Sequence, residues 1–180
     1  MRIVQAALSG VFELAPRVFE DQRGDFFETY RRSAMAEIGI DVEFVQENQS
    51  RSRRHVLRGM HYQIHCAQGK LIRVVAGEVF DVAVDLRRSS PSFGKWFGTR
   101  LSAQNRQMLW VPEGFAHGFL ALSEYADVLY KTTDYYAPEH ERCLRWDDST
   151  VGVAWPIEVA PLLSAKDAVG KPLHEAECFD

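Results

Sequence analysis

Hydrophobic and polar residues alternate in short runs along the chain between Val11 and Tyr136, which is the pattern of β-strands. The clearest run is Glu78–Leu86. Its side chains divide between one face (Phe80, Val82, Val84 and Leu86) and the other (Val79, Asp81, Ala83 and Asp85). Gly77 stands just before the run, where a turn is needed. We therefore predict a strand across Glu78–Leu86.

The other runs are also short and end at turn-forming residues. They are Val11–Phe19 (broken by Pro16), the part of Asp21–Tyr30 that follows a turn at Gly24, Met108–Val111, Ala116–Leu122 and Val128–Tyr136. One short helix is predicted at Ser33–Ile38, ended by Gly39. After Pro138 the strand pattern fades into a charged tail. Many short strands and one helix predict an all-β fold, an antiparallel sandwich or jelly roll, with residues 1–180 as one domain.

Composition and charge narrow the classes of partner. The chain has 180 residues, 46% of them hydrophobic, and a formal net charge of -4. Its only basic block is Arg51–Arg54, which we interpret as a solvated strand edge, so we expect no nucleic-acid partner. No apolar run is long enough for a membrane span or a signal peptide. The three cysteines are widely spaced and odd in number, which favours a reducing cytoplasm.

Ionisable residues concentrate in Leu57–Gly77, a segment that otherwise has the composition of β-structure. The segment contains Arg58, His61, His65 and Lys70. Charged groups are costly to bury without partners, so a functional site is expected here.

Two sequence motifs resemble those of the cupin superfamily of small β-barrels. Pro112, Gly114 and His117 fit the second cupin motif, and His61 fits the first metal ligand of the other motif. Gln63 replaces the second histidine, however, and Lys70 falls where a glutamate ligand is expected. A protonated amine repels a divalent cation and glutamine is a poor ligand, so we predict a cupin-like cavity without a metal. His65 is predicted to lie in a loop or on the surface.

Seven motifs in order carry a more specific resemblance. They are Arg23–Tyr30 (RGDFFETY), Gln46–Ser50 (QENQS), Leu57–Gln63 (LRGMHYQ), Gln68–Arg87, Val111–Phe119 (VPEGFAHGF), Tyr130–Glu141 and Leu163–Asp167 (LSAKD). Together they make the chain similar to the dTDP-4-dehydrorhamnose 3,5-epimerase family, although the loop between His61 and Lys70 is one residue shorter than expected. The resemblance implies a homodimeric jelly-roll enzyme that uses no cofactor. It also implies a dTDP-4-keto-6-deoxy sugar as substrate.

The resemblance assigns roles to individual residues. The implied reaction removes protons at C3 and C5, beside the C4 ketone, so it needs a base, a group for the enolate oxygen and an acid. The implied catalytic residues are His61 as base, Asp167 as its orienting carboxylate, Lys70 at the enolate oxygen and Tyr130 as acid. Arg23 and Arg58 suit the diphosphate, and Phe26 or Tyr136 suits stacking on thymine. The other implied substrate-binding residues are Glu28, Gln46, Glu47, Asn48, His117, Glu141 and Lys166.

Other interpretations of these residues remain open at this point. Tyr130 could be ordinary strand packing, Asp167 a cap or surface charge, and Arg23 a turn arginine paired with Asp21 or Asp25. An epimerase acting at one carbon or a ketoisomerase would share the same motifs. A non-catalytic sugar-binding cupin and a metal-dependent cupin oxygenase are further alternatives, and Lys70 argues against the last.

Overall fold

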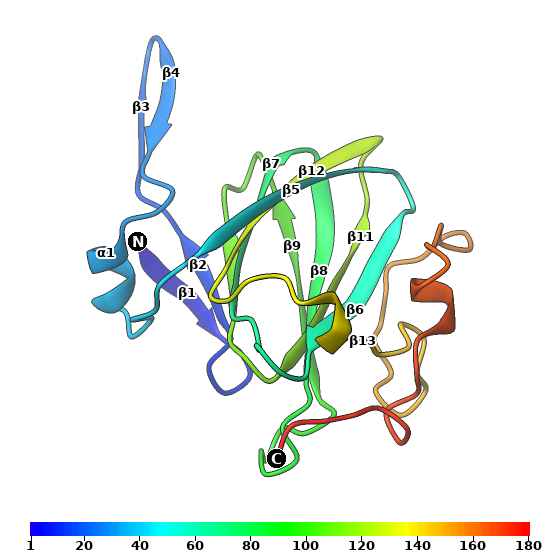
Figure 1. Cartoon of the computed structure of the whole chain (residues 1–180). Helices are drawn as coiled ribbons and strands as arrows, with labels where there is room; N and C mark the ends of the chain where they lie inside the picture. The colour runs from blue at the N-terminus through cyan, green and yellow to red at the C-terminus, as the bar shows by residue number, and fades with distance from the viewer.

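Two antiparallel sheets packed face to face make up the body of the computed structural model, which describes residues 1–180 (Figure 1). The first sheet consists, in spatial order, of β1 (Arg2–Ala6), β2 (Phe12–Ala15), β10 (Met108–Val111), β7 (Lys70–Ala76), β12 (Tyr125–Thr132) and β5 (Gln46–Arg53). The second consists of β13 (Glu141–Cys143), β6 (Leu57–Gln63), β11 (Phe115–Ala121), β8 (Glu78–Asp85) and β9 (Trp96–Ser102). The predicted all-β jelly roll is therefore confirmed.

Three short helices and one hairpin complete the chain. The helices are α1 (Arg32–Ala36) and the 3₁₀ turns η1 (Pro138–His140) and η2 (Asp167–Val169). Gly39 follows the predicted helix with a φ of 87°, a left-handed conformation that suits glycine. Strands β3 (Val18–Asp21) and β4 (Gly24–Phe27) pair only with each other and extend away from the sheets (Figure 1). We call this hairpin the arm.

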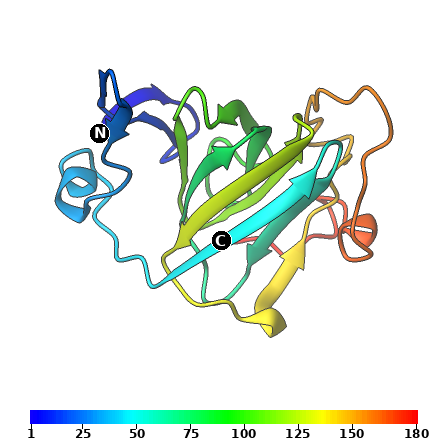
Figure 2. The ribbon, with the colours of Figure 1, turned by 90° about the horizontal axis from the view of Figure 1, so that it is seen from above.

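Strand β8 buries both of its faces, although each packs against a different layer. Val79 and Ala83 belong to the core between the two sheets, whereas Val82 and Val84 belong to a second core on the outer face of the five-stranded sheet. The residues that cover this outer face include Leu144, Val151, Leu173 and Ala176. The segment after Pro138 is therefore not a loose tail, as its charge had suggested, but a covering layer (Figure 2).

The end of β12 also differs from the prediction. The strand stops at Thr132 instead of Tyr136, and the chain then turns towards the side chain of Gln63. The Gln63 amide donates to the carbonyl oxygen of Tyr135 (3.2 Å) and accepts from the backbone N–H of Ala137 (2.8 Å). Side-chain hydrogen bonds thus replace the sheet ladder in this loop.

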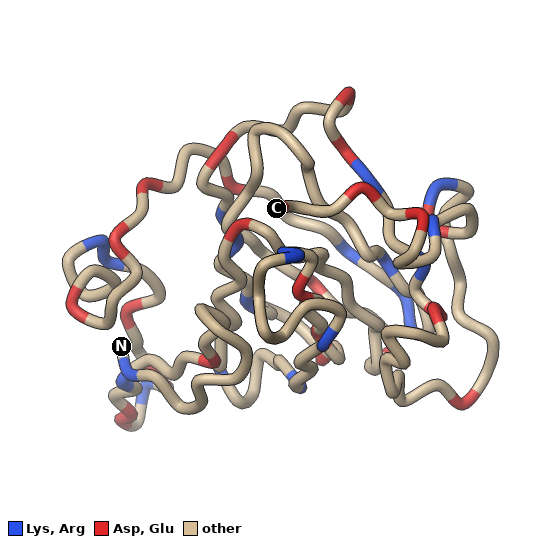
Figure 3. Tube along the Cα trace, turned by 90° about the horizontal axis from the view of Figure 1, so that it is seen from below, with Lys and Arg blue, Asp and Glu red and all other residues tan.

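Charges of both signs are interspersed along the chain, as Figure 3 shows. None of its helices is long and apolar enough to cross a membrane.

Candidate active site

A cavity of about 360 Å³ opens into the sandwich between strands of both sheets. Ten of the residues predicted for the site line it: Gln46, Asn48, Arg58, His61, Lys70, His117, Tyr130, Tyr136, Glu141 and Lys166. They come from β5, β6, β7, β11, β12 and the segments that follow. Alternation along β5 turns Gln46 and Asn48 to the same face. On β6, Arg58 and His61 are three residues apart, and an irregularity in the β11–β6 register lies between them.

His61 on β6 forms a hydrogen-bonded pair with Asp167 at the start of η2. The distance from His61 Nε2 to Asp167 Oδ1 is 2.5 Å, and Asp167 is only 3% exposed. Burial alone would raise the pKa of Asp167, but hydrogen bonds from His61 and Ser164 hold this pKa below its ordinary value. Asp167 is therefore a buried carboxylate that fixes the orientation of the His61 ring.

Lys70 on β7 lies beside this pair in the wall of the cavity. Its ammonium Nζ donates to the backbone oxygen of His61 (3.2 Å), and the residue is 8% exposed. Burial lowers the pKa of Lys70 to about 8, although Glu141 and Asp81 oppose the shift. Lys70 is thus easier to deprotonate than an exposed lysine, but it still carries its charge at neutral pH.

A second histidine–carboxylate pair lies on the neighbouring strands. His117 on β11 is paired in register with His61, and its Nε2 lies 2.8 Å from Asp81 Oδ1 on β8. Asp81 is fully buried, and its other carboxylate oxygen has no hydrogen-bond partner. His117 also lines the cavity.

Tyr130 on β12 and Glu141 on β13 face the cavity from its other walls. Burial raises the pKa of Tyr130, so its phenol keeps its proton at neutral pH. Glu141 accepts hydrogen bonds from the Tyr136 hydroxyl (2.8 Å) and from Lys166 Nζ (2.7 Å). These bonds outweigh the effect of burial and keep the pKa of Glu141 low. The cavity therefore holds two lysines and one ionised glutamate around the histidines.

Arg58 lies at the edge of the cavity and is partly free to bind a ligand. Its Nε donates to Ser52 Oγ (2.9 Å) and its Nη2 to the backbone oxygen of Arg51 (3.2 Å). Nη1 has no partner in the chain. A guanidinium held in this way can present its remaining N–H groups to an anion.

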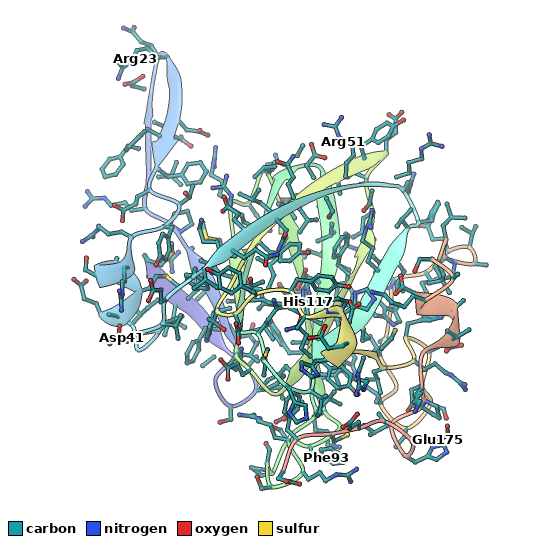
Figure 4. All side chains as sticks on the ribbon, in the orientation of Figure 1. Arg23, Asp41, Arg51, Phe93, His117 and Glu175 are labelled. Atoms are coloured by element: carbon teal, nitrogen blue, oxygen red, sulfur yellow. The ribbon has the colours of Figure 1, made fainter.

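Four predicted substrate-binding residues lie outside the cavity of their own chain. Arg23 is at the tip of the arm, away from His117 in the sandwich (Figure 4), and is paired with Asp21 at 2.6 Å. Phe26, also on the arm, is 71% exposed. Glu28 pairs with Arg31, and Glu47 pairs with Lys131.

The cupin metal position does not fit an ion in this chain. The Gln63 amide is used in three backbone hydrogen bonds, to Cys66, Tyr135 and Ala137. Lys70 occupies the place of the acidic ligand and offers no lone pair while it is protonated.

Several residues in or beside the cavity were not predicted. Ser50 and Gln68 line the cavity, Asp81 orients His117, and Cys143 lies next to His61 in the β13–β6 register. Asp81 was detectable, because it interrupts the apolar face of β8 that carries Val79 and Ala83. Ser50 and Gln68 lie inside two of the seven motifs but were given no role, and Cys143 lies in none of them.

Fold and site together define a protein of the cupin-like jelly-roll class whose cavity carries ionisable side chains where cupins carry metal ligands. A family model described as dTDP-4-dehydrorhamnose 3,5-epimerase matches residues 5–175. The chain is 58% identical to the dTDP-4-dehydrorhamnose 3,5-epimerase of Pseudomonas aeruginosa, over 99% of both chains. The chain belongs to the dTDP-4-dehydrorhamnose 3,5-epimerase family.

Solved structures agree with this assignment. The dTDP-6-deoxy-D-glucose-3,5-epimerase of Legionella pneumophila, in complex with dTDP-4-keto-L-rhamnose, superposes with a TM-score of 0.95 at 45% identity, covering 98% of this chain and 94% of that one. A 3'-monoepimerase from Streptomyces bikiniensis, in complex with dTDP-quinovose, superposes with a TM-score of 0.87 at 33% identity, covering 94% and 86%.

Proposed function

We propose that this chain epimerises a dTDP-4-keto-6-deoxy sugar at C3 and C5, as in dTDP-L-rhamnose biosynthesis. The observation that carries the proposal is that the His61–Asp167 pair, Lys70 and Tyr130 all meet in or behind one cavity. A base, a cation and a weak acid around one space are the groups that proton exchange beside a ketone requires. Membership of the epimerase family supports the same reaction.

In the proposed reaction His61 is the base. Asp167 accepts the N–H of Nε2, so Nδ1 keeps its lone pair and takes the proton from C3 or C5. The C–H electron pair moves to the C4 oxygen as an enolate, which the Lys70 ammonium stabilises. Tyr130 returns a proton to the same carbon from the opposite face and recovers its own from solvent, to which His61 releases the proton that it took. A positioned proton-transfer group contributes about 10²–10⁴-fold and one enolate donor about 10²–10³-fold, so all of them are needed.

The nucleotide is held by the remaining polar residues of the cavity. We assign the diphosphate to Arg58 and the point charge of Lys166, with Gln46, Asn48, His117 and Glu141 as further polar contacts. Tyr136 lies at the cavity and is 53% exposed, which suits stacking on thymine.

We also infer that the working form is a homodimer. A two-stranded hairpin is marginally stable alone, yet the arm carries Phe19 and Phe26 at 52% and 71% exposure. The four predicted substrate-binding residues outside the cavity could then contact substrate only if the arm and its surroundings bind a second copy of the chain. They are Arg23, Phe26, Glu28 and Glu47. We infer further that residues 1–180 act as one domain in a reducing cytoplasm, which the three free thiols support.

Solvent exchange tests the reaction directly. Incubation of dTDP-4-keto-6-deoxyglucose in D₂O should place deuterium at both C3 and C5, as read by proton NMR of the product. A sample without protein gives the spontaneous exchange, and the His65→Asn variant serves as a matched control because His65 is exposed outside the cavity. Deuterium at one carbon alone would make this chain a mono-epimerase like the Streptomyces bikiniensis enzyme.

A further inference from the structure

Cys143 lies beside the His61–Asp167 pair and has no part in the proposed reaction. It is paired in register with His61 across β13 and β6. One ligand atom each of His61, Cys143 and Asp167 lie within 4.8 Å of one another. Cys143 and His61 are half-buried, and Asp167 is buried. A thiol is thus built into the wall behind the base.

These three side chains are a donor set that zinc prefers. Zn²⁺ binds imidazole nitrogen, thiolate and carboxylate, and in sites with three protein ligands a water or a bound molecule takes the fourth position. Of the three, only His61 lines the cavity, so the site lies in the wall of the cavity. The set is distinct from the cupin metal position, which Gln63 and Lys70 make unsuitable.

We propose that His61, Cys143 and Asp167 form an inhibitory zinc site. Zinc binding and the proposed reaction exclude one another, because the two side chains that share the His61–Asp167 hydrogen bond would both be ligands of the ion. When zinc binds Nε2, the neutral ring carries its one proton on Nδ1, so no lone pair faces the substrate and Asp167 no longer holds the ring by a hydrogen bond. Metal-free protein is the active form, and zinc is a reversible inhibitor.

The movement that this requires is small. Zinc–ligand bonds of about 2.0–2.3 Å place neighbouring tetrahedral ligands roughly 3.5 Å apart. The His61–Asp167 distance must therefore open by about 1 Å and the Cys143 sulfur must approach by a similar distance. Cys143 Sγ is held only by a weak contact to the backbone oxygen of Leu144 (3.6 Å), and its thiol proton passes to the buffer when the ion binds.

Calorimetry with zinc chloride on chelator-treated protein tests the proposal. We expect one Zn²⁺ per chain, and Cys143→Ser should weaken binding at least about tenfold while activity in metal-free buffer stays near wild type. Cys66→Ser and Cys178→Ser are the matched controls, because neither thiol belongs to the cluster, and both should bind zinc as wild type does. Unchanged zinc binding in Cys143→Ser, or an equal loss in a control, would overturn the site.

Cobalt gives a readout that depends on no variant. Co²⁺ added to the wild-type chain should produce the near-ultraviolet absorption band of a thiolate–cobalt bond and inhibit in parallel. Absence of the band overturns the proposal. The inhibition rests on the proposed epimerase function, whereas zinc and cobalt binding do not. A chain that binds metal but never exchanges deuterium would refute the epimerase function alone.

Discussion

The charge of the single residue Lys70 is needed for the proposed reaction but is unfavourable for folding. The proposed enolate contact needs a positive charge, whereas its position inside the sandwich makes that charge expensive. Burial lowers the pKa of Lys70 to about 8. Below that pH both the folded and the unfolded chain hold the proton, so the folded state carries the full penalty. The penalty is relieved as pH rises from about 8 to about 10.5, where only the unfolded chain remains protonated.

Lys70→Met should therefore separate activity from stability. We expect kcat to fall at least about 10²-fold and the free energy of unfolding at pH 7 to rise by about 1–4 kcal/mol, because methionine fills the space without a charge. In the wild-type chain kcat should decline as pH rises through about 8. Urea titration and a pH profile measure both effects. A destabilised Lys70→Met chain, or a wild-type kcat that is flat up to pH 10, would contradict this account.

Single residues of the site were predictable where a motif named them. The fold brings ten of them to one cavity, but the partners that set their chemistry lie far away in sequence. Asp81 is 36 residues from His117, and Asp167 is 106 residues from His61. The resemblance named Asp167 as the partner of His61, but no local pattern identified Asp81 as the partner of His117. The lowered pKa of Lys70 was equally hidden, because it arises from burial by strands of both sheets.

At the scale of elements, the turn between β8 and β9 is held by one carboxylate. Asp85 is fully buried and accepts hydrogen bonds from Arg87, Ser90 and Ser92. Burial alone would raise the pKa of Asp85, but these bonds lower it to about 2. The stabilisation is present above the pKa of the unfolded chain, near 3.9, and is lost as pH falls towards about 2.

Asp85→Asn should lower the free energy of unfolding by about 2–3 kcal/mol at pH 7, because the buried side chain at position 85 loses the charge that its half-buried partner Arg87 neutralises. The difference from wild type should shrink as pH falls from about 4 to about 2. Urea unfolding at several pH values is the measurement. Asp147→Asn is the matched control, since Asp147 is exposed and should change little. A difference that stays constant with pH would refute the role of the Asp85 charge.

The strands with a period of two and the short helix α1 were predicted well, whereas the segment after Pro138 was not. β8 follows its alternation, but β13 and the C-terminal segment are held in other ways. Asp148, for example, accepts backbone N–H groups of Thr150, Val151 and Leu173. Such a segment has no periodic pattern, because side chains, and not a neighbouring strand, accept the hydrogen bonds of its backbone N–H groups. Its covering role is visible only once the outer face of β8 is known.

The whole molecule has a site in its body and an arm that projects away from it. Arg106 forms ion pairs with Asp25 and Glu20 on the arm, which hold the arm to the body beside β7. The tip, with Arg23, extends beyond the sheets. In the proposed homodimer this tip and Phe26 reach the cavity of the partner subunit, so that each site contains residues of two chains.

Two inactive variants should then restore activity when combined. His61→Asn removes the base but keeps the arm, and an arm variant with Arg23→Ser and Phe26→Ser keeps the base. Each homodimer should lose most of its turnover. Mixed dimers contain one site with both an intact base and an intact arm, so an equal mixture refolded together should recover about one quarter of the wild-type activity.

Titration calorimetry with dTDP distinguishes the reasons for failure in each parent. His61→Asn should bind dTDP within about tenfold of wild type, since phosphate contacts supply most of the affinity. The arm variant should bind dTDP more weakly, and the mixture should show two classes of site. Size-exclusion chromatography checks that both parents still form dimers. The opposite outcome is a mixture that stays as inactive as its parents although mixed dimers form. In that case the arm does not contribute to the partner's active site, and Arg23 and Phe26 are not residues of that site.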